Sequence, residues 1–121
     1  NGKPIGAIRR RPAKGDARSN ISAGGSVEKY KLTAADKILC KKVGEKLVRD
    51  GIYYAGLDII GGKLIEVNVM SPGTITDINK MNNTKLQRKI VNYLERVVAE
   101  IRNRKNKSEL VKLSQDAETG S

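Results

Sequence analysis

Apolar residues recur every three or four positions in two stretches of the chain, and this spacing predicts two amphipathic helices. The first helix is expected over residues 33–50, with Thr33 as its N-cap and Asp36 at the third helical position. Asp50 and Gly51 are typical of its end. Its apolar face is expected to contain Ala35, Ile38, Leu39, Val43 and Leu47.

The second helix is expected over residues 84–103, with Asn83 or Thr84 as its cap. Its apolar stripe contains Leu86, Ile90, Leu94, Val97 and Ile101. A short helix is predicted before it, over residues 74–80. The polar residues 104–121 that follow are predicted to form a disordered tail.

Residues 53–70 contain two short apolar strands on either side of two glycines, a pattern typical of a β-hairpin. Three polar residues, Asp58, Glu66 and Asn68, interrupt these strands. In a buried strand each of them costs on the order of a few kcal/mol unless it has a partner. A divalent cation accepts two carboxylates and an amide oxygen together, so the hairpin predicts a metal site.

Strand geometry sets a condition on this site. Side chains alternate between faces, so Glu66 and Asn68 share a face, and Asp58 joins them only if it pairs with Glu66. We expect that pairing to require a three-residue loop, residues 61–63, because a two-residue turn, residues 61–62, would place Asp58 on the opposite face. The alternative is a surface hairpin whose polar residues face water, although both predicted faces look apolar, as in a covered sheet.

A strand is predicted over residues 4–10, followed by a long loop over residues 11–29 that is rich in Gly, Ser and charged residues. Long loops inside a compact domain are usually functional or disordered. Glycines at 15, 24 and 25 allow the backbone to approach a ligand closely and the segment to hinge.

Two blocks of the sequence resemble the ATP-grasp ligases, and among them the bacterial-type glutathione synthetases. Residues 56–73 read GLDIIGGKLIEVNVMSPG and resemble that family's metal-binding hairpin, where an acidic residue and a Glu-x-Asn hold magnesium against ATP phosphates. Residues 10–25 read RRPAKGDARSNISAGG and resemble the family's R-x-P-x-x-G-(E/D)-x-R-x-N-x-x-x-G-G stretch. The blocks follow each other in the family's order, and the resemblance runs from about residue 7 to residue 78. Gly73 departs from the pattern, because many members have threonine there.

The resemblance implies an α+β fold: the C-terminal part of an ATP-grasp domain, with an antiparallel sheet packed against helices. It implies that Asp58, Glu66 and Asn68 bind Mg²⁺ or Mn²⁺, and that Glu66 and Asn68 thereby help to bind ATP. It implies catalytic and ATP-binding roles for Arg10 and Arg18, and a lid function for residues 11–29. Contacts with substrate are implied for Arg10, Asn20, Gly24, Gly25, Ser71, Pro72 and Gly73.

The implied reaction is ATP-dependent joining of γ-glutamylcysteine to glycine through an acyl phosphate, which yields glutathione, ADP and phosphate. An alternative is a related ATP-grasp ligase that adds amino acids to a peptide or protein C-terminus, because residues 18–20 also match those enzymes. By resemblance the N-terminal portion of the enzyme is missing and is expected to be the partner of this chain. The complete enzyme is expected to be a homo-oligomer, and this chain alone to be inactive.

Charge leaves a different possibility open, a small basic module that binds nucleic acid. The chain has 24 Lys and Arg against 13 Asp and Glu, a net charge of +11, and basic clusters bind phosphate chains. With no Trp, no Phe and four Tyr, however, it offers few side chains for stacking on bases. The basic residues of the last helix are therefore interpreted as a solvated face, and nucleic-acid binding is the less favoured hypothesis.

Cys40 is the single cysteine, so no internal disulfide forms and the sequence suits a reducing, cytoplasmic compartment. It lies in a helical apolar pattern and is expected to be buried as a small apolar residue. The absence of histidine excludes a histidine general base and histidine-ligated zinc. No apolar run is long enough to span a membrane, so a membrane partner is not expected.

Overall fold

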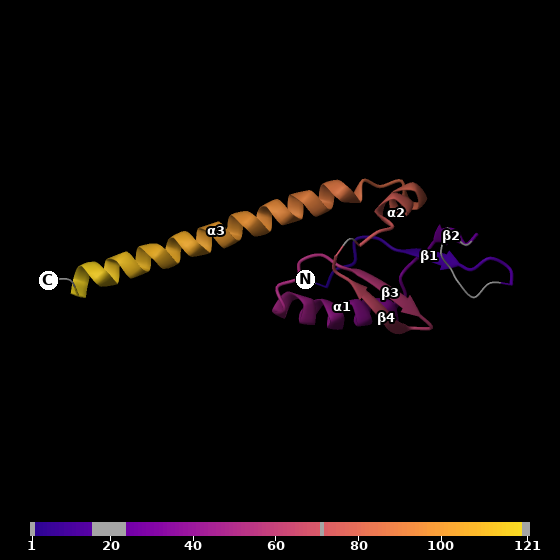
Figure 1. Cartoon of the computed structure of the whole chain (residues 1–121), viewed down its shortest axis with the longest axis horizontal. Coiled ribbons are helices and arrows are strands. Elements are labelled where there is room, and N and C mark those ends of the chain that lie inside the picture. The colour runs from indigo at the N-terminus through magenta and orange to yellow at the C-terminus, as the bar shows by residue number, and fades with distance from the viewer. Residues whose placement is uncertain (1, 16–23, 71, 120–121) are drawn as a thin grey trace. The chain divides into compact units, whose positions relative to one another are not determined.

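The computed structural model describes residues 2–15, 24–70 and 72–119 (Figure 1). Its elements, in chain order, are β1 (Ile8–Arg11), β2 (Ser26–Lys29), α1 (Ala34–Arg49), β3 (Gly56–Ile60), β4 (Lys63–Asn68), α2 (Ile75–Asn82) and α3 (Leu86–Thr119). The chain divides into two units, Asn1–Gln87 and Arg88–Ser121, and the second consists of α3 from Arg88 onward. The α+β class expected from the sequence is confirmed.

The strands form two separate antiparallel sheets of two strands each, β1 with β2 and β3 with β4. The strand expected over residues 4–10 begins later, at Ile8. The loop expected over residues 11–29 is too long at both ends, because Arg11 pairs with Ser26 and Ile8 pairs with Lys29. These strands carry charged residues that pair across the sheet, and such a sequence lacks the apolar alternation by which strands are recognised. Residues 16–23, the middle of the expected lid, lie outside the described residues.

Helix α1 begins as the sequence predicts. The Thr33 hydroxyl accepts a hydrogen bond from the Asp36 amide, and the Asp36 carboxylate accepts one from the Thr33 amide, which together form a capping box. The buried face is rotated from the expected one: Asp36, Cys40 and Gly44 are buried, whereas Ile38 is 58% exposed. Gly44 lies against the backbone of Gly2, where a side chain would not fit.

Two features rotate this face. Asp36 turns inward because its carboxylate accepts hydrogen bonds from three donors, and the N-terminal segment packs closely on Gly44. Cys40 is buried as predicted, 9% exposed, and this burial raises the pKa of its thiol.

The β3–β4 hairpin has the predicted pairing of Asp58 with Glu66, but the predicted turn is wrong. Ile60 pairs with Lys63, so the turn is the two-residue Gly61-Gly62, and both glycines have positive φ, 56° and 74°. Positive φ at both positions is typical of a type I′ turn, which suits the twist of a hairpin. A register shift between Asp58 and Ile59 leaves Ile65 as a β-bulge, and this extra residue restores the Asp58–Glu66 pairing.

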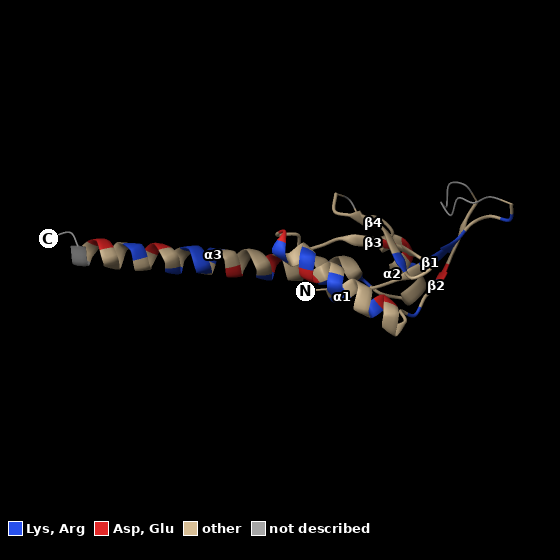
Figure 2. Cartoon of the chain, turned by 90° about the horizontal axis from the view of Figure 1, so that it is seen from below, with Lys and Arg blue, Asp and Glu red and all other residues tan. Residues whose placement is uncertain are grey.

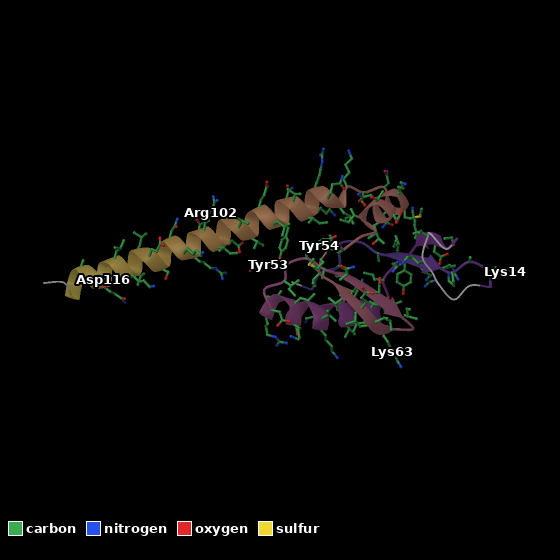
Figure 3. All side chains as sticks on the ribbon, in the orientation of Figure 1. Lys14, Tyr53, Tyr54, Lys63, Arg102 and Asp116 are labelled. Carbon is green, nitrogen blue, oxygen red and sulfur yellow. The ribbon has the colours of Figure 1, made fainter. Side chains whose placement is uncertain are left out.

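The bulge also sorts the side chains of the hairpin into two unlike faces. Leu57, Ile59 and Leu64 are half-buried, and the last two pair directly with each other. Asp58, Glu66 and Asn68 lie on the other face and are exposed, so the expectation that these polar residues are buried in a covered sheet is wrong. Lys63 projects from the turn end of the hairpin (Figure 3).

Helix α2 extends to Asn82, slightly beyond its predicted end. The prediction that Asn83 or Thr84 caps the next helix is wrong. Asn83 ends α2 in the left-handed region, and α3 begins only at Leu86, two residues after Thr84. Instead, the Asn79 side chain accepts hydrogen bonds from the Leu86 amide at 2.9 Å and the Thr84 hydroxyl at 3.1 Å. Leu86 is 2% exposed and lies with Ile78 against Gly6, which makes a small apolar core.

Helix α3 extends far past the predicted end at residue 103, through residues that were expected to be a disordered tail. Those residues are polar, but most of them are Lys, Arg, Glu, Leu, Gln or Ala, which have high intrinsic helix propensity. Along α3 basic and acidic residues follow each other closely, as Figure 2 shows. The apolar residues Val91, Leu94 and Val98 remain exposed on it.

Candidate functional site

The exposed face of the β3–β4 hairpin brings together the three residues that the sequence proposes as metal ligands. Asp58 pairs with Glu66, and two positions further along the strands Gly56 pairs with Asn68. Because positions two apart in a strand face the same way, Asp58, Glu66 and Asn68 share one face. Directly paired residues have Cβ atoms about 5 Å apart, so the Asp58 and Glu66 side chains start close together on this face.

Two carboxylates directly opposite each other repel, and a sheet that places them so is destabilised unless a cation lies between or beside them. Arg10 of β1 supplies one such cation. Its Nη2 atom donates a hydrogen bond to Asp58 Oδ1 at 2.9 Å, and the two side chains are 30% and 49% exposed. Arg10, which the resemblance predicts as a catalytic residue, thus forms an ion pair with Asp58, a predicted metal ligand.

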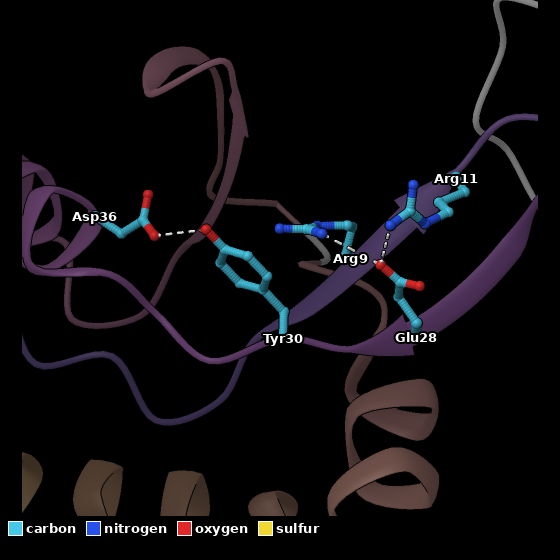
Figure 4. Close-up of polar contacts among 5 residues, drawn as sticks. All are labelled: Arg9, Arg11, Glu28, Tyr30 and Asp36. Carbon is cyan, nitrogen blue, oxygen red and sulfur yellow. Dashed lines mark hydrogen bonds and ion pairs between the residues drawn. The ribbon is translucent and has the colours of Figure 1, made fainter.

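The neighbours of Arg10 make a different set of contacts, shown in Figure 4. Arg9 and Arg11 both reach the carboxylate of Glu28 on β2, with Nη1 and Nη2 atoms 3.4 Å and 3.0 Å from Glu28 Oε1. The hydrogen bond from Arg11 holds the pKa of Glu28 below its usual value. Since residues one apart in a strand face opposite ways, fixing Arg9 and Arg11 to Glu28 directs Arg10 to the other side of β1.

A second set of contacts connects β1 to the start of α1. The Arg9 guanidinium lies 4.6 Å from the centre of the Tyr30 ring, and the Tyr30 hydroxyl donates to Asp36 Oδ2 at 2.8 Å (Figure 4). The Thr33 amide, the Thr33 hydroxyl and the Tyr30 hydroxyl lower the pKa of Asp36. The sequence does not indicate these roles of Glu28 and Tyr30, because the charged residues of β2 predict a loop and because Tyr30 directly follows that strand.

The segment after β4 folds back onto the end of the hairpin. A Cβ atom placed on Gly56 would lie 3.2 Å from Pro72 Cβ and 3.8 Å from Asn68 Cβ, so Pro72 packs closely over this glycine. Thr74 follows with φ of 65°, a left-handed conformation that is unusual for a β-branched residue. Its hydroxyl donates to the carbonyl of Gly73 at 2.6 Å. Of the predicted substrate contacts, Pro72 and Gly73 therefore lie next to the Asn68 end of the proposed site.

The remaining predicted site residues divide into two groups. Gly24, with φ of 81°, and Gly25 lie directly before β2, and Gly24 is close to Ala13 across the base of the loop. The predicted residues that lie outside the described part of the chain are Arg18, Asn20 and Ser71.

Within the described residues, no three His, Cys, Asp or Glu side chains are grouped to hold a metal ion. The donors that the hairpin offers are two carboxylates and one amide oxygen, a set typical of magnesium, which takes one or two carboxylates and completes its shell with water and phosphate oxygens. The guanidinium on Asp58 shows that this face already accommodates a positive charge. The residues present therefore fit a hard divalent cation bound together with a phosphate ligand.

Comparison with known proteins bears on the family to which the two sequence blocks point. A family model described as the ATP-grasp domain of prokaryotic glutathione synthetase matches residues 1–83, which include both blocks. The chain belongs to the prokaryotic glutathione synthetase family. The resemblance drawn from the sequence is confirmed, and the ATP-grasp assignment places the β3–β4 hairpin and Arg10 within the matched domain.

Glutathione synthetases from three bacteria illustrate the relationship. The protein from Gloeobacter violaceus is 45% identical over 93 residues, which are 77% of this chain and 29% of that protein. The one from Thermosynechococcus vestitus is 40% identical over 94 residues, which are 78% of this chain and 30% of that protein. The one from Agrobacterium fabrum is 44% identical over 80 residues, which are 66% of this chain and 25% of that protein. The chain thus spans less than a third of the length of these curated relatives.

None of the helices in the described residues is long and apolar enough to cross a membrane.

Proposed function

We propose that this chain is the C-terminal part of an ATP-dependent carboxylate–amine ligase that joins γ-glutamylcysteine to glycine. The proposal rests on membership of the glutathione synthetase family and on one structural observation. That observation is the hairpin register, which sets Asp58 opposite Glu66 with Asn68 on the same face and Arg10 bonded to Asp58.

In this proposal Asp58, Glu66 and Asn68 hold Mg²⁺ or Mn²⁺. Bound there, the ion would offset negative charge on the ATP phosphates during γ-phosphoryl transfer. Glu66 and Asn68, which both lie on β4, would thereby also help to orient the nucleotide. The exposure of all three side chains supports this role, since a ligand carrying phosphate must reach them from solvent.

Arg10 and Arg18 are proposed to stabilise the phosphoryl oxygens and the acyl phosphate that forms on the carboxylate of γ-glutamylcysteine. A guanidinium suits this work because its fork of donors matches pairs of phosphate oxygens. The amine of glycine then attacks the acyl phosphate and releases inorganic phosphate. Residues 12–25, which connect β1 to β2, are proposed to cover this intermediate and keep water away from it.

Substrate contacts are proposed for Asn20, Gly24 and Gly25 near the loop and for residues 71–73 after β4. The close packing of Pro72 on Gly56 supports the second group, because it holds the backbone of this segment beside Asn68. The backbone amide of Gly73, directly after Pro72, is proposed to bind a substrate carboxylate.

We further propose that the purine pocket and the remaining phosphate contacts come from a portion of the enzyme that this chain does not cover, and that the assembled enzyme is a homo-oligomer. The exposed apolar side chains on the hairpin and on α3, which include Ile60, Ile65, Val91 and Val98, support association with further protein.

A chimera tests the proposed function. The matched 93 residues of the Gloeobacter violaceus glutathione synthetase are replaced by those of this chain, and ADP release is measured with γ-glutamylcysteine, glycine and Mg-ATP. We expect turnover that depends on both substrates. A chimera that unfolds at the temperature of its parent but releases no ADP would contradict the proposal.

A further inference from the structure

Three consecutive arginines in β1 have different partners, and the difference points to a function for the middle one. Arg9 and Arg11 share Glu28 on the neighbouring strand β2, within the same small sheet. The side chain of Arg10 instead donates a hydrogen bond to Asp58 in the second sheet, 48 residues further along the chain.

We propose that Arg10 restricts access of the divalent cation to Asp58, so that the cation binds well only when a phosphate anion draws Arg10 away. This inference rests on the proposed metal role of the hairpin and adds to it a coupling between cation and anion. Arg10 thereby determines that the site binds the cation–phosphate pair rather than the cation alone.

Arg10 already occupies one oxygen of the Asp58 carboxylate. Arg10 Nη2 lies 2.9 Å from Asp58 Oδ1, a distance typical of a charge-assisted hydrogen bond. A divalent ion on the same carboxylate would stand within a few ångströms of the guanidinium, and like charges that close repel even in water. The cation must therefore displace Arg10 or bind less tightly beside it.

The second step is the cost of displacing Arg10. Glu28, the acidic residue of β2, already forms ion pairs with Arg9 and Arg11, so it is not a ready alternative partner for Arg10. A phosphate group is such a partner, because guanidinium binds phosphate oxygens in pairs. Binding of the anion to Arg10 frees Asp58, and by thermodynamic reciprocity binding of the cation to Asp58 strengthens binding of the anion.

The test measures Mn²⁺ binding to this chain by electron paramagnetic resonance, with no nucleotide or phosphate present. Arg10→Gln removes both a positive charge and the bond to Asp58. Arg11→Gln removes the same charge from the adjacent residue and leaves that bond in place, so it is the matched control. Asp58→Asn, alone and combined with Arg10→Gln, reports whether Mn²⁺ uses Asp58.

We expect Arg10→Gln to bind Mn²⁺ about two- to five-fold more tightly than Arg11→Gln, the range that corresponds to an exposed ion pair. Asp58→Asn should remove this gain. Equal affinities for the two arginine variants, with binding still dependent on Asp58, would overturn the restriction by Arg10 while leaving the metal site intact. Mn²⁺ binding that is insensitive to Asp58→Asn would overturn both the metal site and this inference.

A second readout follows Arg10 itself. In a Mg²⁺ titration of the wild-type chain, the Nη–H resonances of Arg10 should shift and exchange faster with water as the Nη2 bond to Asp58 breaks, whereas the Nη–H resonances of Arg9 and Arg11 should stay unchanged. Saturation with Mg²⁺ that leaves the Arg10 resonance unmoved would also overturn the proposal.

Discussion

At the scale of single residues, the account depends on which side chains lie on the exposed face of the β3–β4 hairpin. Asp58, Glu66 and Asn68 were identified from the sequence because acidic and amide residues are out of place in apolar strands, and their shared face is confirmed by the register. The contact of Arg10 with Asp58 could not be derived from sequence, because it joins two sheets that no local pattern relates. The positive φ of Thr74 could not be predicted from the sequence either, because threonine rarely adopts that conformation.

Thr74 gives a first prediction, at the residue scale. Its φ of 65° costs a β-branched residue on the order of 1 kcal/mol, and glycine adopts that conformation freely. Thr74→Gly should therefore raise the free energy of unfolding by up to about 1 kcal/mol, measured by urea denaturation. Thr74→Val is the control, because it retains the branched Cβ and loses only the hydroxyl. A Thr74→Gly variant no more stable than Thr74→Val would show that the strain is absent.

At the scale of elements, sequence patterns predicted most reliably where the controlling contacts are local. The limits of α1 follow from a capping box between Thr33 and Asp36 and from the glycine after its end, all readable within a few residues. The hairpin turn was predicted wrongly because the bulge at Ile65 depends on cross-strand pairing, which compensates for the shorter turn. Strand β2 was missed because its partner lies across a long connection, and its pattern is charged rather than apolar.

The start of α1 gives a prediction about stability. Thr33→Ala removes the hydroxyl that accepts from the Asp36 amide, so it should lower the free energy of unfolding by about 1 kcal/mol at pH 7. Urea denaturation followed by circular dichroism measures this difference. Thr84→Ala is the control, because it removes a hydroxyl from the α2–α3 connection and leaves α1 intact. The difference between the two losses of stability is the part that is specific to the cap. Equal losses in the two variants would contradict a special role for the capping box.

The stability that Asp36 contributes at the start of α1 should decrease at low pH. Hydrogen bonds from Thr33 and Tyr30 lower the pKa of Asp36 in the folded chain, so its contribution is fully present above the ordinary carboxyl pKa of about 4. That contribution is lost as pH falls from about 4 through the lower folded pKa. Asp36→Asn should therefore lose less stability than wild type between pH 5 and about pH 2. Parallel pH curves for the two proteins would contradict the lowered pKa.

At the scale of the whole molecule, this chain contributes only part of the proposed ligase site. The family match establishes an ATP-grasp domain, and the chain spans less than a third of its curated relatives. Both two-stranded sheets have strands that pair with no further strand among the described residues. Large apolar side chains are exposed on the β3–β4 hairpin, among them Ile60 and Ile65, and on α3, among them Leu110 and Leu113. Such surfaces favour association with further protein.

Activity of the isolated chain gives the prediction at this scale. Residues 1–121 expressed alone should release no ADP from Mg-ATP in the presence of γ-glutamylcysteine and glycine. The reason is that, in our proposal, the purine pocket and most phosphate contacts come from a portion of the enzyme that this chain does not cover. The parent Gloeobacter violaceus enzyme serves as the positive control. Turnover by the isolated chain that requires both substrates would contradict the proposed division of the site.

The central claim, that the exposed face of the β3–β4 hairpin serves phosphoryl transfer, is tested most directly by Glu66→Gln in the chimera. We expect kcat to fall at least about a hundredfold, the effect of removing one electrostatic contact to the transition state. We expect the free energy of unfolding to change by less than about 0.5 kcal/mol, because Glu66 is exposed. Glu45→Gln, an exposed glutamate on α1, should leave both quantities unchanged. A Glu66→Gln chimera that turns over at the unmodified rate in saturating Mg²⁺ would contradict the claim.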